Sequence, residues 1–264
     1  MSVAVCLTAC KPSPKGPSLS EYGAQSETSQ RIRFEQYIKD LYALPTADAL
    51  TRQDSLMREA ASDSARWRQT LRLEEFFLMD PNSPYRSEEL YIPVLESLLA
   101  SPFATEEERL HAEWVEPRIR LNRLGTEASD FAYVTRDGRP HTLYETIDRR
   151  KPAQTLLFFS NPGCPNCKEI TEALSADPAI QARIDDGRLL VLNIYPDEDL
   201  QAWFDYLPEY PKEWICGYDP DQVIRSDTRY WLRAIPSLYL LDEKKRVVLK
   251  DAPLEQVLVY CKQR

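Results

Sequence analysis

The sequence predicts an α/β domain in its C-terminal half, preceded by a small all-α helical bundle. Apolar residues recur every three or four positions from about Ser26 to Gly125, and afterwards short apolar strands alternate with helical stretches. The chain has 264 residues, of which 43% are apolar, enough for a buried core in one large domain or two small ones. We expect an N-terminal leader at 1–25, a helical bundle at 26–124 and the α/β domain at 125–264.

Composition excludes several kinds of function. The chain has 33 Lys and Arg against 42 Asp and Glu, a net charge of -9, which argues against nucleic acid as a partner. Its only histidines are His111 and His141, so it cannot build a multi-His metal site. Its seven glycines form neither GxGxxG nor a P-loop. We therefore expect no metal and no cofactor.

The first residues resemble a lipoprotein export signal. Residues 1–9 are mostly small and apolar, and a Pro/Ser-rich run follows at 11–18. Leu7-Thr-Ala-Cys10 resembles a bacterial lipobox, which implies a lipidated Cys10, a flexible tether and a periplasm-facing protein held at a membrane of the cell envelope. Nine residues precede Cys10 and none is basic, so either translation starts upstream or the match is chance.

Five helices are expected before Gly125. Pro45 ends the first and Thr46 is placed to cap the second, while Thr105-Glu-Glu-Glu108 is a capping box for the last. Nothing here indicates catalysis, and His111, one turn before Trp114, has the setting of a structural residue. The helices are expected at about 32–42, 46–57, 64–79, 84–99 and 105–124.

After Gly125 the apolar pattern becomes that of strands. The run 155–159 is fully apolar, as in a strand buried on both faces of a sheet. Asp137-Gly138 has the chemistry of a hairpin turn. Strands are expected at 131–134, from 141, and at 155–159, 189–195, 214–217 and 246–250, with helices at 168–186, from about 197, from 220, and up to 261.

A Cys-x-x-Cys pair, Cys164-Pro-Asn-Cys167, stands between the strand at 155–159 and the next helix. Unpaired N–H groups and the dipole at a helix start stabilise an anion, here the thiolate of Cys164, and thiolate is the reactive form. Pro165 suits the first helical position, and Cys167 follows within disulfide reach. We expect Cys164 to be the exposed nucleophile and Cys167 the more buried resolving thiol.

Residues 125–264 resemble the thioredoxin-fold family, in particular the membrane-anchored, periplasm-facing thiol–disulfide oxidoreductases. The lead-in 128–138 is similar to that family's N-terminal hairpin, and Ile235-Pro236 with residues 237–242 is similar to its cis-proline and following strand. The resemblance implies catalysis by Cys164 and Cys167, substrate binding at Ile235 and Pro236, protein thiols or disulfides as substrates, and an upstream redox partner. The helical region resembles a domain found before such modules in Bacteroidetes lipoproteins.

Some positions depart from that family. Gly163 stands where many relatives have Trp, and Phe158 where many have a buried acid that accepts the proton of the resolving thiol. Proton transfer then falls to water or to Glu169. The alternative is a non-catalytic binding module, in which the bundle recognises a partner and the Cys pair is structural. Cys216 and Cys261 are expected to be buried, and whether they pair stays open, as does the direction of the redox reaction.

Overall fold

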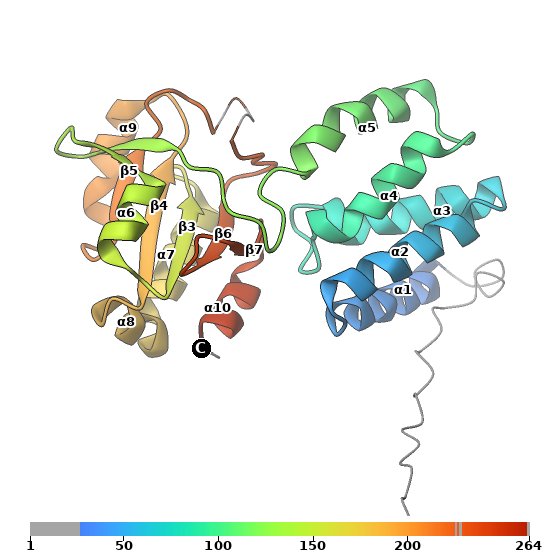
Figure 1. Cartoon of the computed structure of the whole chain (residues 1–264), viewed down its shortest axis with the longest axis horizontal. Helices are drawn as coiled ribbons and strands as arrows, with labels where there is room; N and C mark the ends of the chain where they lie inside the picture. The colour runs from blue at the N-terminus through green and yellow to red at the C-terminus, as the bar shows by residue number, and fades with distance from the viewer. Residues whose placement is uncertain (1–26, 225, 227–228, 263–264) are drawn as a thin grey trace, which may run out of the picture.

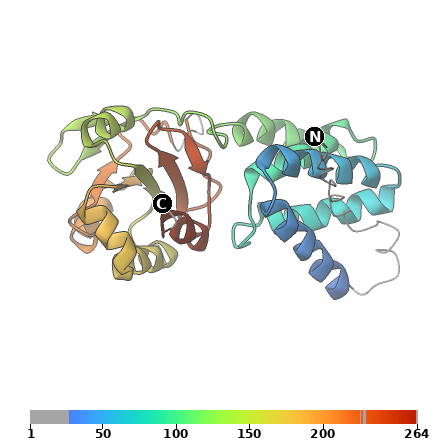
Figure 2. The same cartoon turned by 60° about the horizontal axis from the view of Figure 1, so that its bottom comes forward.

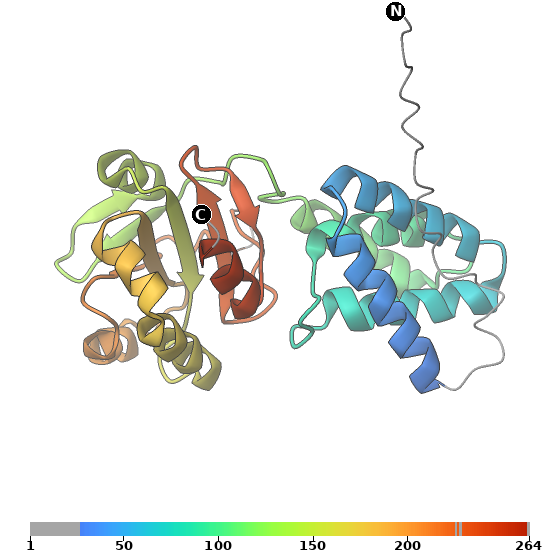
Figure 3. The ribbon, with the colours of Figure 1, turned by 90° about the horizontal axis from the view of Figure 1, so that it is seen from below.

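The computed structural model describes residues 27–224, 226 and 229–262. The leader expected at 1–25, with Cys10, lies outside these residues. A helical region lies beside an α/β region, and the three views agree that strands β6 (Ser237–Asp242) and β7 (Val247–Leu249) are on the side nearest the helices (Figures 1, 2 and 3). Within the described part of the chain, no helix is long and apolar enough to cross a membrane.

The helical region contains the five helices expected from the sequence. The third ends in a π-helical segment, η2, in place of its last α-helical turn. Apolar side chains from all of them share one core, to which Trp231 of the α/β region also belongs. The elements are α1 (Glu27–Tyr42), α2 (Thr46–Ala60), α3 (Ser64–Glu74), η2 (Glu75–Met79), α4 (Glu88–Ala100) and α5 (Glu106–Ile119).

The ends of these helices confirm one expectation and correct two. The capping box at Thr105 and Glu108 is present. Thr46 does not cap α2, because the helix already includes it and Pro45 takes the N-cap position. Helix α5 stops at Ile119, not at residue 124, because Asn122 takes a positive φ of 51° and its buried side chain bonds the backbone of the α/β region.

The α/β region is a seven-stranded mixed sheet in the order β2-β1-β5-β4-β3-β6-β7. Strands β3, β4 and β5 are parallel, and the others pair antiparallel. The remaining elements are β1 (Ala132–Thr135), β2 (Pro140–Thr142), α6 (Leu143–Arg150), β3 (Gln154–Phe159), α7 (Pro165–Ala176), α8 (Pro178–Asp185), β4 (Leu189–Tyr195), α9 (Leu200–Tyr206), η3 (Leu207–Glu209), β5 (Ile215–Tyr218) and α10 (Leu254–Lys262).

Both faces of the sheet are covered, as the apolar run of β3 predicted. Side chains alternate along a strand, so Leu156 and Phe158 face one hydrophobic cluster and Leu157 and Phe159 another. Residues of α7, α8, α9 and α10 belong to the first cluster and residues of α6 to the second. Cys167 lies in the first cluster, so its thiol points into the core under α7.

The helix expected from Pro220 is wrong. The described residues between β5 and β6 form turns and bends. Asp219 favours turns over a helix in this segment, because its buried carboxylate accepts hydrogen bonds from the backbone N–H groups of Asp221 and Ile224. Gln222 then has a positive φ of 53°, which a right-handed helix does not contain.

A buried cluster of charges joins the two regions. Arg233 lies 3.2 Å from Glu88 and 2.8 Å from Asp251, and Lys250 lies 2.7 Å from Glu88. The side chains of all four are at most 8% exposed. Asp251 also accepts a hydrogen bond from Ser237 at 2.9 Å, the residue after Pro236. The start of β6 is thus tied to the helical region through fully paired charges.

Candidate active site

The Cys-x-x-Cys pair begins helix α7, as the sequence predicted. Cys164 is the N-cap residue and Pro165 the first helical residue. The Cys164 Sγ accepts a hydrogen bond from the backbone N–H of Cys167 at 3.3 Å, one of the free N–H groups at the helix start. Both cysteines are free thiols.

The two thiols differ in exposure. Cys167 is buried, whereas Cys164 is half-buried rather than fully exposed, because it packs against the edge of the cluster that contains Cys167. Burial of the side chain, and next the hydrogen bond with Cys164, raise the pKa of the Cys167 thiol to about 12. Near neutral pH Cys167 is therefore protonated.

The backbone conformation explains why a glycine, Gly163, stands directly before the cysteine pair. Its φ is +71°, in the left-handed region that glycine enters without strain. A side chain there would meet nothing within 4 Å, so the backbone conformation and not the available space favours glycine.

Ile235 and Pro236 lie beside the cysteine loop. The Ile235–Pro236 peptide bond is cis, as expected. Ser237 pairs with Phe159, the last residue of β3, so Pro236 precedes β6 at the edge of the sheet where β3 runs toward Cys164. Ile235 packs against the same cluster as both cysteines. The structure therefore brings all four predicted site residues of the α/β region together, while their chemical roles remain predictions.

Phe158, in the position where many relatives have an acid, is fully buried and packs edge-to-face on Trp214 at 6.0 Å. Glu169, the other candidate proton acceptor, is exposed on α7. The cluster around Cys167 is apolar and aromatic. The described residues contain no group of three or more His, Cys, Asp or Glu that could hold a metal ion.

Two tyrosines near the thiols were missed from the sequence. Tyr206 and Tyr210 pack in the same cluster as the thiols, and burial raises the pKa of both side chains. The Tyr210 hydroxyl is 2.9 Å from the Ser160 hydroxyl, which accepts a hydrogen bond from Asn193 at 2.7 Å. The aromatic residues crowded at 203–210 were the only signal, and they do not indicate which ring would reach the thiols.

Cys216 also lies on this face of the sheet. It pairs with Asn193, which pairs with Phe158, so the three side chains form one row under α7. Burial raises the pKa of Cys216 to about 12. Cys216 and Cys261 belong to the same cluster and both are free thiols. Cys261 is buried as expected, whereas Cys216 is half-buried at the edge of the cluster.

The fold and this site define a thioredoxin-fold protein with a Cys-x-x-Cys pair at a helix start. A crystal structure of a thioredoxin-like protein from Bacteroides caccae is 35% identical, with 94% of this chain and 88% of that chain covered and a TM-score of 0.81. The chain therefore belongs to the thioredoxin-like proteins, as the resemblance predicted. The helical region matches a family model described as a domain of unknown function, DUF5106, over residues 22–120.

Two further solved structures cover about half of the chain. The C-terminal domain of an uncharacterized protein from Bacteroides fragilis is 46% identical over 53% of this chain and 97% of that chain, with a TM-score of 0.50. The thioredoxin domain of a thiol-disulfide oxidoreductase from Bacteroides vulgatus covers 53% of this chain and 98% of that chain at 18% identity and a TM-score of 0.44, too low to argue for activity. No curated protein matches the sequence.

Proposed function

We propose that this protein is a thiol–disulfide oxidoreductase that acts on protein disulfides through Cys164 and Cys167, held at a membrane by a lipidated Cys10 and facing the periplasm. One observation carries the redox proposal. Cys164 caps a helix with its Sγ 3.3 Å from a free backbone N–H, while Cys167 is buried and protonated behind it. Membership of the thioredoxin-like proteins supports the same chemistry.

The proposed reaction begins with attack by the Cys164 thiolate on one sulfur of a substrate disulfide. A mixed disulfide forms, and the other substrate sulfur leaves as a thiolate. Cys167 then attacks Cys164, closes the intramolecular disulfide and releases the first substrate sulfur. The substrate gains two electrons and the cysteine pair loses them, so an upstream dithiol partner must reduce the pair again.

Proton transfer from Cys167 is the demanding step. Its pKa of about 12 places it almost wholly in the thiol form, and its buried neighbours Phe158 and Trp214 offer no carboxylate. The departing substrate thiolate, or water reaching the loop, has to take the proton. We therefore expect slow resolution, with some mixed disulfide accumulating on the unaltered protein.

Substrate binding is proposed at Ile235 and Pro236. The peptide group of Ile235 precedes the first ladder pair of β6, beside the end of β3. An extended substrate chain could pair with it as an added strand, which gives affinity without sequence specificity. Ile235 also packs against the cluster that contains the thiols, so a strand paired there would pass close to them.

Trapping on the two cysteines tests the roles. Cys167→Ser should retain substrates as mixed disulfides on Cys164, and Cys164→Ser should retain almost none, as read by non-reducing electrophoresis after expression in the native compartment. Equal trapping by both variants, or by neither while insulin reduction stays normal, contradicts the assignment. Absence of redox activity in every form favours the alternative, a binding module with a structural Cys pair.

Membrane fractionation tests the proposed anchor separately. Native protein should sediment with membranes, and Cys10→Ala should release it or leave its leader unprocessed. A native protein that stays in solution and keeps Met1 would rule out the lipid anchor but leave the redox proposal untouched.

A further inference from the structure

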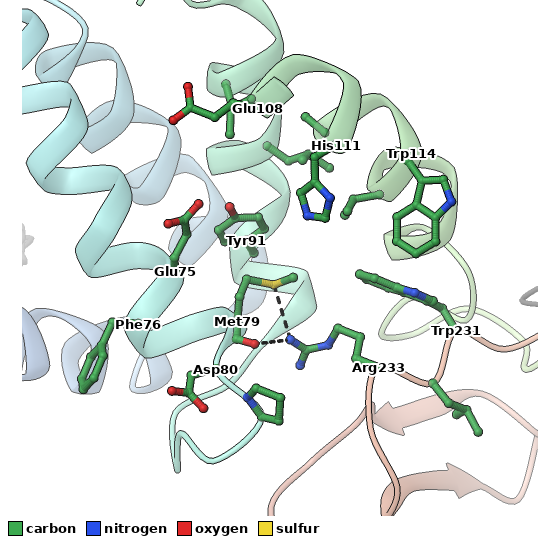
Figure 4. A pocket seen from close by; sticks show the side chains of 16 residues that line it. Glu75, Phe76, Met79, Asp80, Tyr91, Glu108, His111, Trp114, Trp231 and Arg233 are labelled. Atoms are coloured by element: carbon green, nitrogen blue, oxygen red, sulfur yellow. Dashed lines mark hydrogen bonds between the residues drawn. The ribbon is translucent and has the colours of Figure 1, made fainter. Parts of the chain in front are cut away.

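A cavity of about 800 Å³ lies between the helical region and the segment before Ile235 (Figure 4). The helical region contributes residues of η2, α4 and α5, and the α/β region contributes residues 231–233. Its size and its position between two regions are typical of sites for small organic ligands. The π-helical turn matters here, because wide turns of this kind occur often at functional sites.

Aromatic rings form one wall of the cavity. Trp114 and Trp231 meet edge-to-face at 6.1 Å, and His111 stacks on Trp114. Trp114 is 47% exposed, and the guanidinium carbon of Arg118 lies 4.0 Å from the centroid of its ring. The opposite side carries Glu75 and Tyr91, and Figure 4 shows their side chains around the same space as His111.

The Tyr91 hydroxyl lacks a partner although its side chain is buried. Tyr91 is 5% exposed, and no hydrogen bond to its hydroxyl occurs within the described part of the chain. The hydroxyl oxygen is not among the fully buried polar atoms without a partner, so it is open to the cavity and available to a ligand there.

The charges at the cavity are mainly negative. Glu75 and Asp80 have no cationic partner among the described residues, and Glu108 is already paired with Arg68 at 3.0 Å. Arg233 adds no free positive charge, because it is held by Glu88, Asp251 and the Met79 carbonyl. Partial burial and the Glu108 carboxylate raise the pKa of Glu75, as expected for an acid without a counter-ion.

We propose that this cavity binds an organic cation, a primary ammonium or guanidinium on an apolar arm. The cation would pair with the Glu75 carboxylate and donate a hydrogen bond to the Tyr91 hydroxyl. Its apolar arm would pack among the apolar side chains of the cavity, because the guanidinium groups of Arg118 and Arg233 already lie over the Trp114 and Trp231 rings. A free amine and a Lys or Arg side chain of a polypeptide share this chemistry. The site uses neither Cys164 nor Cys167, so it does not depend on the proposed redox function.

Tryptophan fluorescence and calorimetry on the full chain test the proposal with two pairs of probes. One pair is phenethylamine and its uncharged analogue 2-phenylethanol. The other is a short peptide with one lysine and the same peptide acetylated at that side chain. The charged member of at least one pair should bind at least about tenfold more tightly than its neutral member, and the pair that does so identifies the source of the cation.

Variants locate the binding. Glu75→Gln should weaken the charged probe at least about tenfold, and Tyr91→Phe by roughly 2- to 10-fold. Glu113→Gln removes an exposed acid of α5 outside the cavity and should change nothing. The proposal is overturned if no charged probe binds, if neutral probes bind equally well, or if Glu75→Gln and Glu113→Gln behave alike.

Discussion

Cys167 and Glu88 lie in two buried regions, one that keeps its ionisable group neutral and one that contains paired charges. Around Cys167 the neighbours are apolar and aromatic, and burial holds the thiol in its neutral form. Glu88 lies against Arg233 and Lys250, and Arg233 in turn pairs with Asp251. The interface therefore surrounds its buried charges with counter-ions, whereas the surroundings of the Cys167 thiol offer none. Four substitutions, each with its own measurement, test this difference.

The largest effect is expected in the reactivity of Cys167. In a folded Cys164→Ser variant at about pH 8, iodoacetamide should modify Cys167 about a thousandfold more slowly than in the unfolded chain, because only the thiolate reacts. Mass spectrometry at Cys167 gives the rate, and the same protein in denaturant is the control. A folded rate within tenfold of the unfolded one would show that the pocket stabilises the thiolate after all.

The next largest effect, on the free energy of unfolding, is expected at the buried charge cluster between the helical and α/β regions. Glu88→Gln leaves Arg233 and Lys250 buried with a single carboxylate between them, which should lower the free energy of unfolding by about 3–5 kcal/mol. Glu96→Gln is the matched control, because Glu96 is half exposed and pairs with Arg120 at the surface, worth under about 1 kcal/mol. Equal losses in urea unfolding would mean that the buried cluster is no stronger than a surface pair.

Glu74 resembles Cys167 more than it resembles Glu88, because its carboxyl is buried with only Gln53 as a hydrogen-bond donor. Burial raises its pKa to about 8. A carboxyl whose pKa is raised in the folded state stabilises the fold fully at pH values below its pKa in the unfolded chain. This stabilisation is lost as the pH rises toward its pKa in the folded protein. The unaltered protein should lose about 2.5 kcal/mol from this group between about pH 5 and pH 7.

Glu74→Gln should remove that slope. Its urea midpoint should change less with pH than that of the unaltered protein, and the difference between the two should grow from pH 5 to pH 7. Parallel pH profiles for the two proteins would contradict the assignment of a neutral, buried Glu74.

The smallest effect concerns a neutral hydrogen bond near the thiols. Tyr210→Phe removes the contact with Ser160, and we expect a loss of about 1 kcal/mol in unfolding free energy. Tyr206→Phe is the control, because the Tyr206 hydroxyl has no hydrogen bond within the described residues. A loss near that of Glu88→Gln would erase the contrast between neutral and charged contacts.

The parts predicted well from the sequence have local causes. The apolar run of β3 fixes a strand buried on both faces, and the following Pro165 starts a helix at the cysteines. The capping box of Thr105 with Glu108 likewise needs only four consecutive residues. The site residues could be found because Cys164 and Cys167 are neighbours in sequence and the motif around Pro236 is short.

The parts that were missed depend on distant pairings. Arg233 and Glu88 are 145 residues apart, and nothing in the sequence of either segment indicates the other. Tyr210 and Ser160 are 50 residues apart, and nothing in the sequence around either residue indicates their contact. The helix expected from Pro220 failed because the Asp219 side chain competes for the backbone donors that the helix needs.

Equilibration of the purified protein in glutathione buffers of increasing oxidation tests whether Cys164 and Cys167 form a redox pair. Thiol labelling and mass spectrometry should show Cys164 and Cys167 passing together and reversibly from dithiol to a shared disulfide, while Cys216 and Cys261 keep their thiols. A pair that stays reduced, or stays oxidised, across the whole range would contradict the account of a redox site.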